Sequence, residues 1–128
     1  MKIEVSNGEI LDKITILIIK SKRITDPNKL KNINAELEEL LPYLDIFGYS
    51  SNESVRSLVQ ELENINKKLW DVEDELRDKE RKKYFDDNFI ELARLVYFTN
   101  DKRAEVKKKL NEITNSKLIE EKSYQKYD

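Results

Sequence analysis

The sequence predicts an all-α protein, a bundle of about four helices in which the third and fourth form a long antiparallel hairpin. Its 128 residues include only two Gly and two Pro, which leaves little turn chemistry for a many-stranded fold. Hydrophobic residues make up 38% and charged residues 39% of the chain, and the apolar ones recur at helical spacing. This length suffices for one modest core, so we expect a single helical domain over residues 1–128.

The first helix is expected to follow a short extended lead. Residues 6–9, Ser-Asn-Gly-Glu, have the form of a capping box. In it the Ser6 hydroxyl accepts from the Glu9 N–H, and the Glu9 carboxylate reaches back to Ser6. The helix would run to about Ile24. The β-branched run 14–19 would also suit a buried strand, but the cap, the length and the basic residues near the end favour a helix.

The second helix is signalled by Asp26-Pro27, an N-cap followed by proline at the first helical position. Pro42 should kink or end this helix, because proline removes a hydrogen bond and clashes with the preceding turn. Gly48 closes the region. The apolar stripe is Leu30, Ile33, Leu37, Leu40 and Leu44.

The third helix is expected to begin after Ser51 or Asn52 and to run to about Lys82, roughly 45 Å at 1.5 Å per residue. A polar-faced helix of this length is not stable alone, so it must pack on partners. Its heptad-like stripe is Val55, Leu58, Leu62, Ile65, Leu69, Val72 and Leu76. We interpret the stripe as bundle core; a coiled-coil seam between two copies of the chain is the alternative.

The fourth helix is expected after a turn at residues 84–87. Asn88 and Glu91 form a second candidate capping box, so the helix would start at Phe89 and reach about Ile113.

Two polar residues, Asn100 and Arg103, interrupt the apolar face of this fourth helix. The tail that follows, residues 115–128, is polar apart from a few apolar side chains. We expect it either to form a short helix that packs back on the bundle or to be mobile.

Composition excludes several kinds of site. The chain has no Cys, so it has no disulfide and no thiolate site, and it has no His. Zinc, haem and iron–sulfur sites are therefore not expected, and any metal would be a hard ion such as Mg²⁺ held by carboxylates. The net charge of −2 argues against a dedicated nucleic-acid binder. We see no signal peptide and no apolar run that could span a bilayer, and so expect a cytoplasmic protein.

A candidate site emerges if the hairpin turns near Phe85, because residues equally far from the turn then face each other. Two arginines and a lysine could grip phosphate or carboxylate, and the carboxylates could orient them or hold a metal. A Trp and a Tyr would line the wall. The predicted ligand-binding residues are Lys13, Trp70, Glu73, Arg77, Arg94, Tyr97, Asn100 and Asp101.

Plainer interpretations of this group are surface salt bridges or a buried structural network. No P-loop, dinucleotide fingerprint or HExxH motif is present. Glu75 and Asp78 have an acidic spacing found in all-α nucleotide pyrophosphatases, but the string at 36–39 lacks the third Glu of those enzymes. Chorismate-mutase-like helical enzymes bury Arg, Lys and Glu between helices, yet no string here matches them. No motif assigns a reaction.

Several strings are nevertheless similar to a known family. They are Ser6…Gly8-Glu9…Asp12-Lys13-Ile14-Thr15-Ile16-Leu17, Trp70…Glu73-Asp74…Arg77, Glu91-Leu92-Ala93-Arg94…Val96-Tyr97 and Glu120-Glu121-Lys122-Ser123-Tyr124. Together they resemble an uncharacterised bacterial family of short helical proteins, a domain of unknown function. The chain departs from the family pattern at Asn7, where an aromatic residue is usual, and at Ile18, where an acidic one is. The second departure removes a carboxylate from the first helix.

The resemblance implies a small cytoplasmic helical protein with no known reaction. Its association with glycosyltransferase and surface-polysaccharide genes suggests a phosphosugar or nucleotide-like ligand, or a partner enzyme. The leading hypothesis is thus a binding protein or small enzyme that accepts an anion in a polar site between helices. The alternative is a non-catalytic interaction module that uses its long helices to form a homodimer or to dock a partner.

Overall fold

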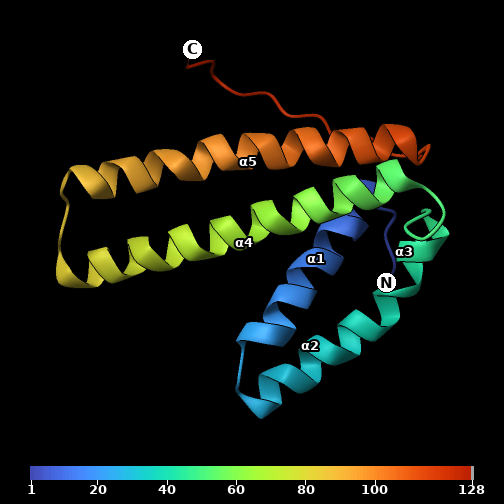
Figure 1. Cartoon of the computed structure of the whole chain (residues 1–128), viewed down its shortest axis with the longest axis horizontal. Coiled ribbons are helices and arrows are strands. Elements are labelled where there is room, and N and C mark those ends of the chain that lie inside the picture. Colours follow the sequence, from blue (N-terminus) through green and yellow to red (C-terminus); the bar gives the residue numbers. More distant parts are fainter. Residues whose placement is uncertain (128) are drawn as a thin grey trace.

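The computed structural model describes residues 1–127; Asp128, the last residue of the predicted domain and tail, lies outside them. The helices are α1 (Asn7–Arg23), α2 (Pro27–Leu40), α3 (Pro42–Ile46), α4 (Glu53–Lys82) and α5 (Asp87–Ile113). Helices α4 and α5 form a long antiparallel hairpin (Figure 1), and α1 packs on both of them and on α2. No strand occurs within residues 1–127, so the predicted all-α hairpin bundle is confirmed.

Helix α1 confirms the helical interpretation of residues 14–19. The Ser6 hydroxyl accepts from the Glu9 N–H at 3.2 Å, as predicted for an N-cap. The Glu9 carboxylate, which we expected to reach back to Ser6, contacts the Lys107 ammonium of α5 at 2.7 Å. The charge at this helix end therefore joins two helices and does not serve the cap alone.

Helices α2 and α3 lie at the edge of the bundle. The Asp26 carboxylate accepts from the N–H groups of the first turn of α2, as the Asp-Pro signal predicts. Pro42 ends α2 and begins α3, because proline fits the first turn of a helix but not its interior. Of the stripe predicted for α2, only Ile33 is buried, so α2 contributes little to the core.

The core lies where α1 crosses the end of the hairpin farthest from its turn (Figure 1). Its buried cluster combines one α1 residue with the stripes of α4 and α5. The members are Leu11, Val55, Val59, Leu62, Val106 and Leu110. Asn66 takes a position on the buried face of α4 between Leu62 and Leu69. The hydrophobic effect thus fixes α1 at this end and leaves the turn end of the hairpin outside the cluster.

The capping box predicted at Asn88 and Glu91 is wrong. The N-cap of α5 is Asp86, whose carboxylate accepts from the Phe89 N–H at 2.9 Å. The same carboxylate lies 3.2 Å from the Lys79 ammonium near the end of α4. A negative charge at a helix N-terminus is favourable, and the lysine across the turn adds to it.

Asp86→Ala is therefore expected to lower the melting temperature, whereas Asn88→Ala, its matched control, should leave it unchanged. The Phe89 N–H and then Lys79 hold the pKa of Asp86 below its usual range. A carboxylate whose pKa is lower in the folded state stabilises the fold fully at pH values above its unfolded pKa of about 3.9. This stabilisation is lost as the pH falls through the folded-state pKa. The difference between wild type and Asp86→Ala in thermal unfolding should thus shrink below about pH 4. A larger loss in Asn88→Ala would contradict the assignment.

The tail after α5 forms no helix up to residue 127, and it runs back along α5 (Figure 1). Ser116 accepts from the Asn7 N–H at 2.9 Å, and Lys108 lies 3.1 Å from Glu121. The first of these contacts binds the start of the tail to α1, and the second binds its middle to α5. Within residues 1–127, none of the helices combines the length and apolar character of a membrane span.

Candidate functional site

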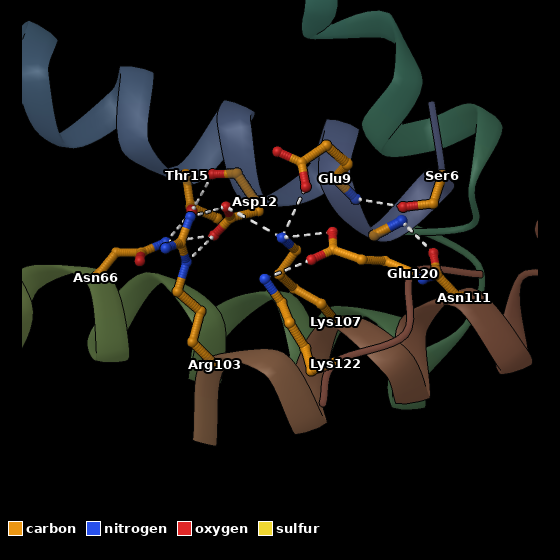
Figure 2. Close-up of polar contacts among 11 residues, drawn as sticks. Ser6, Glu9, Asp12, Thr15, Asn66, Arg103, Lys107, Asn111, Glu120 and Lys122 are labelled. Carbon is orange, nitrogen blue, oxygen red and sulfur yellow. Dashed lines mark hydrogen bonds and ion pairs between the residues drawn. The ribbon is translucent and has the colours of Figure 1, made fainter. Parts of the chain in front are cut away.

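A buried carboxylate, Asp12 of α1, lies at the meeting point of α1, α4 and α5 (Figure 2). The Arg103 guanidinium of α5 grips it with two N–H groups: Nε donates to Oδ1 at 3.0 Å, and Nη2 to Oδ2. Asn66 of α4 donates to the same Oδ1 at 2.8 Å and to the Thr15 hydroxyl at 2.9 Å. The Thr15 hydroxyl in turn donates to the Asp12 carbonyl at 2.7 Å. One carboxylate therefore joins three helices.

This Asp12 network is a structural device. Its polar atoms satisfy one another, and among residues 1–127 no buried side-chain nitrogen or oxygen lacks a hydrogen-bond partner. The hydrogen bonds to Asp12 raise the pKa of Arg103, because they stabilise the charged guanidinium. The bidentate geometry also fixes the Arg103 side chain at the surface of α5.

One turn further along α5, Lys107 is the centre of a second set of charges (Figure 2). Its ammonium lies 2.7 Å from Glu9, 4.0 Å from Asp12 and 3.5 Å from Glu120 of the tail. The other oxygen of Glu120 lies 2.7 Å from the Lys122 ammonium. Lys107 is largely buried, with 12% of its side chain exposed, whereas Lys122 is 48% exposed. The tail carboxylate therefore links a fixed lysine to a surface lysine.

A pocket of about 660 Å³ lies beside these charges, between α5 and the tail. Three cations, three tyrosines and an asparagine amide line it, together with apolar side chains. The lining residues are Val96, Tyr97, Asn100, Asp101, Arg103, Ala104, Lys107, Lys122, Tyr124, Gln125 and Tyr127. The pocket thus combines positive charge with aromatic surface.

Aromatic contacts hold the end of the tail on α5. The Tyr127 ring packs edge-on against Tyr97, with centroids 5.4 Å apart, and against Phe98 at 5.0 Å. The Tyr127 hydroxyl donates to the Asp101 carboxylate. The far wall of the pocket is therefore built by the tail and not by a helix.

Three of the eight residues predicted to bind ligand line this pocket: Tyr97, Asn100 and Asp101. They follow one another at helical spacing on α5, so a single face of that helix carries them. The other five lie outside the pocket lining.

Two of those five make cation–π contacts. The Arg23 guanidinium lies 5.7 Å from the Trp70 ring centroid, and the Arg94 guanidinium lies 5.6 Å from that of Phe98. Trp70 is therefore next to the end of α1, and Arg94 lies along α5 with its side chain over a neighbouring ring.

The remaining three make exposed ion pairs. Lys13 lies 2.6 Å from Glu36 of α2. Arg77 lies 3.9 Å from Glu73 and 3.3 Å from Asp74, all on α4, and its side chain is 73% exposed. These contacts match the surface salt bridges that were the plainer interpretation of the predicted group. That these residues bind a ligand stays a prediction.

Four residues of the site are not predicted from the sequence: Asp12, Asn66, Lys107 and Lys122. Asn66 carried a usable signal, because it lies on the apolar face of α4 and a buried amide needs a partner. Arg103 was recognised as an interruption of an apolar face, but its partner is 91 positions away in the chain. Lys122 lies in an irregular segment, where no periodicity indicates which way a side chain points.

A metal centre would need several carboxylates placed around one ion. Within the described part of the chain, residues 1–127, no group of three or more Asp or Glu side chains is placed to hold an ion. A role for Mg²⁺ stays a prediction.

Comparison with known proteins supplies a family but no function. No curated protein and no solved structure matches the chain. One family model, described as a family of unknown function (DUF6165), matches residues 1–127. The match spans all four segments on which the resemblance was based. The chain therefore belongs to the DUF6165 family, a family of unknown function.

Proposed function

We propose that the protein binds a small anionic ligand that carries a flat ring, such as a nucleotide, in the pocket between α5 and the tail. The observation that carries this proposal is the lining of the pocket. The pocket has a volume of about 660 Å³, and three cations and three tyrosines line it. Ligand pockets commonly have volumes of about 300–1,000 Å³ and are mostly apolar with a few placed polar groups.

The cations are held in place before any ligand binds. Arg103 is fixed by its bidentate pair with Asp12, and Lys107 by its 2.7 Å contact with Glu9. Side chains that are already ordered lose less entropy on binding, which favours affinity. The lining carries three cations and one carboxylate, Asp101, but each cation is already paired with a carboxylate outside the lining. Lys122, whose partner Glu120 is 37% exposed, is the cation best placed to accept an anionic group of the ligand.

The tyrosines favour a ring over a sugar alone. Tyr97, Tyr124 and Tyr127 offer aromatic surface on which a base could stack. The Tyr127 hydroxyl already donates to Asp101. The Asn100 amide can donate and accept, as recognition of a base edge requires. A phosphosugar would use the cations but leave the aromatic surface uncovered. Nucleotide-like ligands therefore fit better than phosphosugars.

The test is thermal unfolding with four probes: uridine monophosphate, uridine, glucose 1-phosphate and inorganic phosphate. A ligand that binds the folded state raises the melting temperature, and at 100 times its Kd it adds about 2.7 kcal/mol. We expect the nucleotide to give the largest shift, the phosphosugar and phosphate smaller ones, and the uncharged nucleoside the least.

Two matched variants locate the site. Lys122→Met removes a pocket cation, whereas Lys108→Met removes a lysine that also pairs with a tail glutamate, Glu121, but does not line the pocket. The two side chains are 48% and 47% exposed. We expect the nucleotide shift to fall in Lys122→Met and to remain in Lys108→Met. Absence of a shift with every probe, or an equal loss in both variants, would reject the proposal.

A second candidate function, self-association, is favoured by the turn end of the hairpin. Tyr84, Phe85 and Ile90 are 59%, 56% and 54% exposed there. Exposed apolar side chains gathered at one place often mark an interface, and a second copy of the chain is the proposed partner. Sedimentation of wild type and Phe85→Ser at several concentrations tests it: a dimer in wild type that Phe85→Ser dissociates would support it, and a monomer throughout would reject it.

A further inference from the structure

The Glu120 carboxylate is an anion already bound to the lysines of the proposed pocket. One of its oxygens lies 2.7 Å from the Lys122 ammonium, and the other lies 3.5 Å from that of Lys107 (Figure 2). Both lysines line the pocket, and Glu120 does not. The carboxylate therefore approaches the two ammonium groups from outside the pocket.

Glu120 is ionised at neutral pH. The hydrogen bond from Lys122, and then the charge of Lys107, hold the pKa of Glu120 below its usual range. Lys107 is shared with Glu9 and Asp12, so it keeps carboxylate partners when Glu120 leaves, whereas Glu120 is the nearest carboxylate to Lys122. The exchange of Glu120 for another anion would thus leave Lys107 held by Glu9 and Asp12 and would pass Lys122 to the incoming anion.

The contact is also weakly held. Glu120 lies in the irregular tail, and its side chain is 37% exposed. Ion pairs exposed to solvent contribute little, because water screens them and the side chains lose entropy on pairing. A side chain in such a segment can change rotamer without disturbing a helix. Glu120 can therefore be displaced at small cost.

We propose that Glu120 is a built-in competitor: its carboxylate occupies the lysine pair, Lys107 and Lys122, that takes the anionic group of the ligand. This inference rests on the proposed function. It assigns the phosphate or carboxylate of the ligand to the lysine pair, because an anion with two oxygens can reach both ammonium groups as Glu120 does. The ring of the ligand then lies toward Tyr97 and Tyr124, which line the same pocket.

The experiment measures Kd by isothermal titration calorimetry for uridine monophosphate and inorganic phosphate. It compares wild type, Glu120→Gln and Glu121→Gln. The amide keeps the shape of the side chain and removes its charge. Glu121 is the matched control, because it is the neighbouring tail residue and pairs with Lys108, which does not line the pocket between α5 and the tail. Glu120 pairs with the exposed Lys122 and, at the longer distance of 3.5 Å, with the largely buried Lys107. Removing its charge is therefore expected to tighten binding about fivefold.

The outcomes separate this inference from the proposed function. Tighter binding by Glu120→Gln, with Glu121→Gln like wild type, supports the competitor, and so does binding seen only in Glu120→Gln. If wild type binds and Glu120→Gln binds equally or less well, the competitor is rejected and the proposed function stands. Equal tightening in both variants also rejects it, because the cause is then overall charge. If none of the three proteins binds either probe, both proposals fall.

Discussion

Asp12→Asn is expected to lower the free energy of unfolding by about 3–4 kcal/mol, because it removes one partner of a buried ion pair. The substitution leaves the Arg103 guanidinium, 28% exposed, without its counter-charge. The Asp12 carboxylate accepts hydrogen bonds from both Arg103 and Asn66. In Asp12→Asn the NH₂ group of the new amide replaces one of the accepting oxygens and faces a donor, so a hydrogen bond is lost. The loss would loosen the junction of α1, α4 and α5 and would free the Arg103 side chain beside the pocket. Urea unfolding followed by far-ultraviolet circular dichroism measures it.

Asp71→Asn is the matched control, because Asp71 of α4 pairs with Arg23 of α1 at 2.6 Å but is 63% exposed. The charge change is the same, but the Asp71 carboxylate is exposed and accepts from Arg23 alone, whereas Asp12 is buried and accepts from both Arg103 and Asn66. The expected cost is below about 1 kcal/mol. If the two variants lose equal stability, the Asp12 network is not the structural clamp described above.

Gly8→Ala is expected to lower the free energy of unfolding by about 2 kcal/mol or more, because α1 and α5 touch at this glycine. A Cβ at Gly8 would lie 2.6 Å from the Lys107 carbonyl oxygen and 2.9 Å from Asn111 Oδ1. The first of these is helix backbone and cannot turn away. The Gly8 N–H also donates to Asn111 Oδ1 at 2.6 Å, so separating the helices breaks a buried hydrogen bond. Helix propensity alone predicts the opposite sign, since alanine ordinarily stabilises a helix relative to glycine.

Gly48→Ala is the control for a glycine replaced without a clash. A Cβ there meets nothing closer than 3.5 Å, and the cost comes from the positive φ of 98°. That strain is worth about 1 kcal/mol. Urea unfolding of both variants should therefore place Gly8→Ala as the more damaging one. A neutral or stabilised Gly8→Ala would show that α1 and α5 can separate at this point at no cost.

Helix identity and the hairpin followed from local signals. Asp26-Pro27 and Asn52 act through hydrogen bonds to N–H groups two or three residues away, so the sequence around them contains the whole interaction. The heptad-like stripe of α4 needed only a partner with an apolar face, and the short turn made α5 that partner. The start of α5 was placed wrongly, because Asp86 and Asn88 are both good caps and Lys79, seven residues from Asp86, favours the first.

The candidate site likewise contains some residues that local sequence spacing groups together and others that only the packing of the helices brings together. Tyr97, Asn100 and Asp101 could be grouped in advance, because the helical repeat places them on one face of α5. Facing residues across the α4–α5 hairpin, by contrast, predicted a group that takes only Lys13 from α1 and nothing from the tail. The contacts that fix the pocket cations join Asp12 to Arg103 and Glu9 to Lys107, 91 and 98 positions apart. Such pairs depend on how the helices pack, since no local propensity encodes which carboxylate meets which cation. Packing therefore decided the site, and local chemistry decided the helices.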